Sequence, residues 1–349
     1  MANEQAELLK PEEIREAKER IDRVVDALSK IILGREEVIH LVVVGMLARG
    51  HILLEGLPGL GKTELVKGIS RLLGLKFNRV QFTPDLLPGD ITGNNILQET
   101  PEGRRLVFHP GPIFANLVLA DEINRASPKT QSALLEAMQE RRVTVFGHSY
   151  ELPYPFFVLA TQNPIELEGT YPLPEAQVDR FMLKLYLDAT QEDVLERIIG
   201  TRHRGEPPQL GQVLDEEGLR RVFALVDRVH LPAAVGAYIS RLVAATHREH
   251  ALAPDAAKQF VKYGASPRAA IAIAETARAE ALLRGKPNVG FEEVGRVAAP
   301  AMAHRLVLDY TAKLEGVDGR RVVADLLASV PELAKDIPDG LRHAEATRP

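Results

Sequence analysis

Two short stretches of the sequence bring together residue types that bind phosphate and magnesium. The first, GLPGLGKT at residues 56–63, matches the pattern G-x-x-x-x-G-K-[ST]. Glycines let the backbone curl so that successive N–H groups point at phosphate oxygens, and a helix that begins there adds the positive end of its dipole. Lys62 would reach the outer phosphates, and the Thr63 hydroxyl would hold magnesium. The predicted ATP-binding residues are Gly56, Leu57, Pro58, Gly59, Leu60, Gly61, Lys62, Thr63 and Glu64. The alternative is a glycine-rich turn that merely starts a helix.

The second stretch supplies the acids that such a site needs. Asp121 and Glu122 follow an apolar run at residues 117–120, which reads as a buried strand. Because ligands of open parallel sheets bind at the carboxyl edge, Asp121 is expected to face Thr63 and share the magnesium ion. Glu122 would polarise the attacking water. Without the first stretch, the same acids would read as an acidic loop after a core strand.

A third polar group, Asn163, follows another apolar run at residues 156–160. If this run is a strand of the same sheet, Asn163 lies at the same edge, where it would orient the water or contact the γ-phosphate. An asparagine before a proline is also a common turn, and the spacing alone leaves both interpretations open.

Hydrophobic periodicity predicts the elements that position these groups. Apolar residues at helical spacing indicate an amphipathic helix at residues 11–33 and a second helix at 35–49. The run at 52–54 suits a buried parallel strand, and Ser127 and Pro128 are typical of the start of a helix. Past Asp188 the sequence predicts helices without a strand signal. Their expected starts are Thr190, Asp215, Pro232, Pro254, Ser266 and Phe291.

Two further segments read as β-hairpins. Residues 91–109 turn near residues 100–103, and residues 142–152 turn near residues 147–149. Pairs of arginines flank both segments, at 104–105 and at 141–142. In an oligomer they would form a basic stripe or ring, or they would simply blunt exposed hairpin edges.

The composition bounds the class of protein. The chain has 349 residues, which is the length of about two domains, and it is 45% hydrophobic and 26% charged, as expected of a globular protein. It contains no cysteine, which excludes disulfides and thiolate chemistry. The longest apolar run, at residues 41–48, is too short to span a membrane, and no secretory signal is evident. We therefore expect a cytoplasmic protein, and the net charge of −5 argues against a general nucleic-acid binder.

Several long blocks together resemble the signature blocks of MoxR-type AAA+ ATPases. They are GLPGLGKT, LADEINRASPKTQSALLEAMQE, ATQNPIELEGTYPLPEAQVDRF and YGASPRA, in this order between residues 56 and 269. The resemblance implies an α/β core with a five-stranded parallel sheet and two inserted β-hairpins, followed by an all-α lid. We expect the core at residues 1–188 and the lid at residues 189–349. It also implies a homo-oligomeric ring, usually a hexamer, with Mg-ATP between subunits.

The resemblance also implies roles for single residues. By position, Lys62 and Thr63 match the Walker A motif, Asp121 and Glu122 the Walker B motif, and Asn163 the sensor 1 residue. The arginine finger matches Arg180, and the sensor 2 arginine of the lid matches Arg268.

Both arginines also have ordinary interpretations. Arg180 alone would read as a surface ion-pair partner. Arg268 lies in the first turn of a helix, where a cation opposes the helix dipole, and this suggests a role outside the helix. The sequence leaves open whether Arg268 acts within its own subunit or across an interface.

By resemblance, the expected function is that of a chaperone-like remodelling ATPase that matures or activates other proteins, often by metal or cofactor insertion. A separate protein with a von Willebrand factor A-type domain is the expected partner, and the client is not indicated. Two alternatives remain: a nucleic-acid motor, because helicases share the hairpin layout, and a nucleotide-gated scaffold with negligible turnover.

Overall fold

A parallel β-sheet organises the first half of the chain. The computed structural model describes residues 9–57, 59–100, 103–164, 169–201, 208 and 210–333. The five-stranded sheet has the order β2-β5-β8-β1-β9, and neighbouring strands run parallel. The strands are β1 (Ile52–Gly56), β2 (Phe77–Gln81), β5 (Leu117–Asp121), β8 (Phe157–Gln162) and β9 (Leu183–Leu187). Their carboxyl ends therefore share one edge, as the motif positions predict.

Each central strand is apolar on both sides because helices cover both faces of the sheet. In β1, Ile52 and Leu54 pack in one core cluster with α1, α2 and α3, whereas Leu53 packs in the other cluster with α5. The helices are α1 (Pro11–Ile31), α2 (Glu36–Leu47), α3 (Lys62–Leu73) and α5 (Pro128–Glu140). The two N-terminal helices predicted from periodicity are confirmed. Ser127 caps α5 by accepting a hydrogen bond from the N–H of Thr130 (3.4 Å).

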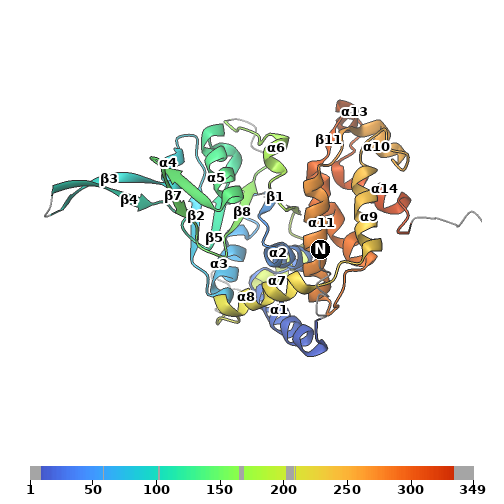
Figure 1. Ribbon diagram of the computed structural model, residues 1–349, viewed down its shortest axis with the longest axis horizontal. Coiled ribbons are helices and arrows are strands. Elements are labelled where there is room, and N and C mark those ends of the chain that lie inside the picture. The colour runs from blue at the N-terminus through green and yellow to red at the C-terminus, as the bar shows by residue number, and fades with distance from the viewer. Residues whose placement is uncertain are drawn as a thin grey trace, which may run out of the picture.

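Both predicted hairpins are present. The first pairs β3 (Gly93–Thr100) with β4 (Gly103–Pro110) and follows the short helix α4 (Pro88–Thr92). It extends far beyond the body of the molecule (Figure 1). The second pairs β6 (Arg142–Val145) with β7 (His148–Glu151). The rings of Phe108 and Tyr150 stack with centroids 3.9 Å apart, so the bases of the two hairpins contact each other.

Helices dominate the second half of the chain, as predicted. They are α7 (Glu192–Thr201), α8 (Glu216–Arg228), α9 (Ala233–Ala244), α10 (Asp255–Phe260), α11 (Pro267–Leu283), α12 (Phe291–Met302), α13 (Tyr310–Leu314) and α14 (Gly319–Ser329). Four predicted starts, Asp215, Pro232, Pro254 and Ser266, are the N-cap residues of α8 to α11. Most of these helices form a unit beside the core, while α8 packs against α1, α2 and α11 (Figure 1).

The prediction of a second half without strands is wrong in one detail. Two short strands, β10 (Val261–Tyr263) and β11 (Val307–Leu308), pair antiparallel within the helical unit. Segments of two and three residues carry no detectable alternation, so their pairing depends on tertiary contacts alone. Among the described residues, every helix is too short or too polar to cross a lipid bilayer.

Candidate active site

The glycine-rich loop lies between β1 and α3, at the carboxyl edge of the sheet. Gly59 and Gly61 both have φ of +82°, a left-handed conformation that side chains with a Cβ rarely adopt, and Gly61 is the N-cap of α3. The loop opens on a cavity of about 370 Å³. This cavity is lined by Gly59, Gly61, Lys62, Thr63, Glu64, Arg79, Asp121, Glu122 and Asn163.

The structure thus brings together five side chains that the sequence indicates: Lys62, Thr63, Asp121, Glu122 and Asn163. They come from α3, from the end of β5 and from the segment after β8. Of the other predicted loop residues, Gly56 is the last residue of β1 and Pro58 lies outside the described residues.

Lys62 lies with its ammonium group on main-chain carbonyls. Its Nζ donates to the carbonyl oxygen of Gly56 (2.5 Å) and to that of Gln162 (3.5 Å). Burial lowers the pKa of Lys62, and the nearby carboxylates of Asp121 and Glu122 oppose that shift. A partly desolvated cation at the start of a helix is well placed for phosphate oxygens.

Thr161 holds the two acids in place and was not singled out by the sequence. Its side chain is fully buried; its hydroxyl donates to Asp121 Oδ1 (2.6 Å) and accepts from the N–H of Glu122 (2.8 Å). Glu122 has φ of +56°, a strained value for a residue with a side chain. The hydrogen bond from the neighbouring strand β8 therefore supports an unfavourable backbone conformation next to the cavity.

Two side chains of β2 also reach the acids. Arg79 contacts Asp121 Oδ2 through Nη2 (2.6 Å) and Nε (3.1 Å), and its Nη2 also donates to Gln81 Oε1 (2.5 Å). The amide of Gln81 donates to Glu122 Oε2 (2.9 Å), which also receives Nη1 of Arg125 (3.0 Å). Arg79 and Gln81 are two residues apart and so share one face of β2, the edge strand that pairs with β5.

The oxygen groups in the cavity fit magnesium. The carboxylate of Asp121 and the hydroxyl of Thr63 line the same cavity. Magnesium prefers oxygen ligands and is usually bound by one or two protein groups together with substrate phosphates. When bound, the ion would neutralise phosphate charge and orient the outer phosphate.

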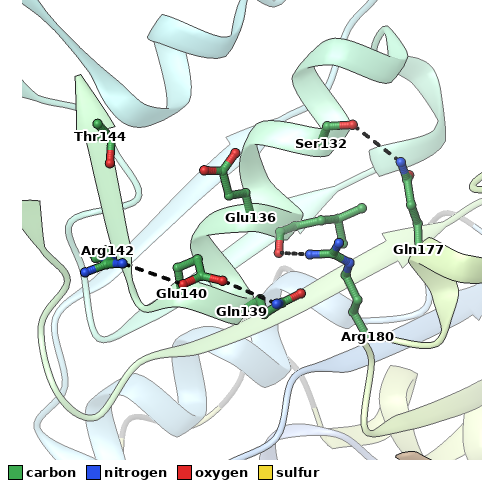
Figure 2. Close-up of a pocket in the computed structure, with 9 residues that line it drawn as sticks. Ser132, Glu136, Gln139, Glu140, Arg142, Thr144, Gln177 and Arg180 are labelled. Carbon is green, nitrogen blue, oxygen red and sulfur yellow. Dashed lines mark hydrogen bonds and ion pairs between the residues drawn. The ribbon is translucent and has the colours of Figure 1, made fainter. Parts of the chain in front are cut away.

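The two arginines predicted from the resemblance lie elsewhere. Arg180 and Arg268 line a second cavity, of about 240 Å³. Nη1 of Arg268 lies 3.4 Å from Asp179 Oδ2, and Ser266 Oγ lies 3.2 Å from the same oxygen. Figure 2 shows Arg180 in an adjoining cavity of about 480 Å³, where its Nη1 donates to the carbonyl of Leu135 on α5 (3.2 Å).

Asp179 ties this region to the helical unit. It follows the short helix α6 (Glu175–Val178), and its Oδ1 accepts from Nε of the buried Arg305 (2.8 Å). Arg305 ends the 3-10 turn η3 (Ala303–Arg305) and also donates to the carbonyl of Phe181 (2.8 Å). The contacts of Asp179 with Arg305 and Arg268 therefore join the helical unit to the core beside Arg180.

Comparison with protein families agrees with this geometry. The model described as "ATPase family associated with various cellular activities (AAA)" matches residues 51–183, and the model "AAA lid domain" matches residues 253–326. The parallel sheet, the glycine-rich loop at residues 56–63 (the phosphate-type loop) and the helical unit define an AAA+ fold with a helical lid.

Individual relatives narrow the class. The chain is 40% identical to the protein named Chaperone MoxR1 of Mycobacterium tuberculosis, over 93% of this chain and 88% of that protein. It is 31% identical to Protein MoxR of Methylorubrum extorquens, over 91% and 94% of the two chains. A solved structure from Cytophaga hutchinsonii superposes with a TM-score of 0.84 at 38% identity, covering 92% of this chain and 97% of that one. The chain belongs to the MoxR family of AAA+ ATPases.

Proposed function

We propose that this chain hydrolyses ATP with magnesium in the cavity between α3 and the ends of β5 and β8. The observation that supports this most is the convergence of Lys62, Thr63, Asp121, Glu122 and Asn163 on one cavity, although they are spread over about a hundred residues. Lys62 would contact the outer phosphates, while Thr63 and Asp121 would hold magnesium. Glu122 would polarise the attacking water, and Asn163 would orient it or contact the γ-phosphate.

We further propose that a second copy of the chain completes each site. Arg180 and Arg268 line a cavity different from the one with the phosphate-type loop. An arginine finger stabilises charge on the transferring phosphoryl group and contributes roughly 10³ to 10⁵ in rate. This placement favours arginines that act across a subunit boundary, in a ring that the family resemblance suggests is a hexamer.

The broader role we propose is chaperone-like remodelling of other proteins. The named relatives include a chaperone, and the ring would couple ATP turnover to maturation or activation of a client. A von Willebrand factor A-type protein is the proposed partner, and the cytoplasm is the proposed site of action. We retain residues 1–188 and 189–349 as the proposed domains, since β9 ends at Leu187.

The Glu122→Gln variant tests the hydrolytic role. The amide keeps the size of the side chain but cannot polarise water as a carboxylate does, so turnover should fall by about 10² or more while ATP binding persists. Phosphate release and the Kd of a fluorescent ATP analogue measure the two properties. Wild-type turnover in this variant would remove Glu122 from its role, and negligible turnover of the unaltered protein would favour a nucleotide-gated scaffold.

Mixing of two inactive variants tests the contribution of a second copy. Arg180→Ala subunits keep the phosphate-type loop, whereas Lys62→Ala subunits keep Arg180. Each preparation alone should be nearly inactive, and mixed rings should recover part of the turnover because one subunit supplies what its neighbour lacks. Absence of recovery, with mixed assembly verified by mass, would contradict the role of Arg180 across the boundary.

A further inference from the structure

The cavity that holds Arg180 and Arg268 is unusually rich in positive charge. Of the described residues that line it, five are arginines and one is an aspartate. The arginines are Arg49, Arg141, Arg180, Arg268 and Arg305, and the acid is Asp179. The buried His51 also lines the cavity, and burial lowers its pKa to about 4, so it is neutral at pH 7.

Three of these arginines have carboxylate partners. Arg49 forms a bidentate ion pair with Asp227 and lies over the ring of Phe223. Arg305 and Arg268 share Asp179.

The other two arginines differ. Within the described residues, Arg141 and Arg180 have no acidic partner, and the contacts recorded for them are with main-chain carbonyls. Nη2 of Arg141 donates to the carbonyl oxygen of Arg49 (3.2 Å). Burial lowers the pKa of Arg141, the nearby Tyr154 opposes that shift, and repulsion from Arg49 adds to it. A half-buried cation without a counter-ion is costly unless a ligand neutralises it.

The backbone at Arg141 gives an independent observation. Arg141 is the C-cap of α5 and has φ of +54°, in the left-handed region. Glycine is the usual residue at such a helix end, because a Cβ strains the left-handed backbone. The chain thus keeps an arginine at a position whose backbone favours glycine. Residues held in such sparsely populated backbone conformations cluster at functional sites.

We propose that Arg141 is a third arginine that contacts the triphosphate of a neighbouring copy, together with Arg180 and Arg268. The ligand chemistry is that of a polyphosphate, which several guanidinium groups in one cavity would bind through charge-assisted hydrogen bonds. The inference rests on the proposed function, because it requires that a second copy present its nucleotide to this cavity. It adds a catalytic residue that lies at the end of α5, directly before β6.

The Arg141→Gly variant separates this role from a structural one. Glycine suits the left-handed backbone, so the melting temperature should stay the same or rise. Turnover per assembled ring should fall about 10²-fold, the effect of removing one donor to developing charge, while the Kd of the isolated subunit for a fluorescent ATP analogue stays within about twofold. Arg141→Lys keeps the charge but loses the planar fork and should be intermediate. The exposed Arg221→Ala, on α8, is the matched control for loss of one charge and should turn over like the unaltered protein.

Mixing identifies the source of the phosphate. Lys62→Ala subunits retain Arg141, so they should restore turnover when mixed with Arg141→Gly subunits. If Arg141 instead served its own subunit or bound a free anion, the defect would persist in the mixture, and the proposal would be overturned. Wild-type turnover of Arg141→Gly rings would overturn it as well. The Arg180→Ala mixture is the reference: if that mixture recovers and the Arg141→Gly mixture does not, only the role of Arg141 fails; if neither recovers, the site shared between copies fails.

Discussion

Asp121 is already engaged by a cation within its own chain. Arg79 lies beside it on the neighbouring strand, with contacts of 2.6 and 3.1 Å to the same carboxylate oxygen. The side chain of Arg79 is 46% exposed and that of Asp121 is 16% exposed, so the pair is accessible to solvent on one side. If magnesium binds Asp121 as proposed, it must compete with this guanidinium.

In the Arg79→Ala variant, magnesium should therefore strengthen nucleotide binding more than it does in the unaltered protein. An ion pair of this exposure contributes at most about 1 kcal/mol, so the gain should be on the order of 5-fold or less. The ratio of nucleotide Kd in EDTA to nucleotide Kd in magnesium measures it. Loss of one positive charge weakens nucleotide binding in both conditions, whereas release of Asp121 strengthens binding only with magnesium. A reduced ratio would show that Arg79 supports the bound metal instead of competing with it.

The contacts that position the two acids could not be predicted from the sequence. The glycine-rich loop and the acids could be predicted from the sequence because each motif is local: the loop spans eight residues and the acids span two. Thr161 and Gln81 act through strands that become neighbours only in the sheet order β2-β5-β8. A single sequence contains no local pattern that pairs Gln81 with Glu122, so these positioning contacts required the structure.

At the scale of elements, His51 connects β1, β8 and α5. Its Nδ1 accepts the N–H of Val158 (3.0 Å), so the proton is on Nε2, which donates to the carbonyl of Met138 (3.0 Å). Only the neutral ring satisfies both partners, because protonated Nδ1 could not accept a hydrogen bond. Burial, with a smaller contribution from the positive charge of Arg141, lowers the pKa of His51 to about 4.

The lowered pKa of His51 predicts that the folded protein loses stability in mild acid. The pKa of His51 is about 6.5 in the unfolded chain and about 4 in the folded chain, so its contribution is complete above pH 6.5 and is lost as pH falls toward 4. The free energy of unfolding should drop by about 3 kcal/mol over that window from this group. Urea unfolding at pH 7 and pH 4.5 measures it. The free energy of unfolding should depend less on pH in the His51→Gln variant than in the unaltered protein, whereas the exposed His148→Gln should leave this dependence unchanged. An equal pH dependence in His51→Gln and the unaltered protein would contradict the assignment.

The prediction of elements succeeded where periodicity is long and failed where it is short. The predicted helix at residues 11–33 has seven buried residues on one face, and the structure has α1 there. Strands β10 and β11, with three and two residues, fall below any detectable period and form because Val261 and Leu308 meet across the helical unit. Hairpin β6–β7 was predictable from its turn at Gly147, which has φ of +81°.

At the scale of the whole molecule, each chain has two cavities that would be the two halves of the proposed shared site. The cavity with Lys62 offers a place for phosphates, and the cavity with Arg141, Arg180 and Arg268 offers guanidinium groups. Asp179 and Arg305 attach the second cavity to the helical unit, so its arrangement depends on how that unit sits on the core. A nucleotide that bridges the two cavities of neighbouring copies would therefore link ATP binding to assembly.

Assembly should accordingly depend on nucleotide and on Asp179. The Glu122→Gln protein, which should retain ATP, is expected to form larger particles with Mg-ATP than without it. A chain that carries both Glu122→Gln and Lys62→Ala should not show this response.

Asp179→Ala removes the carboxylate that Arg305, Arg268 and Ser266 share, leaving the buried Arg305 without its counter-ion. Breaking such a pair costs about 3 kcal/mol, so the melting temperature should fall and assembly should weaken together. Sedimentation with and without Mg-ATP measures particle mass, and Glu217→Ala, which removes an exposed pair with Arg221, is the control. Full ATP-dependent assembly of a destabilised Asp179→Ala protein would show that the helical unit does not position the arginines for a second copy.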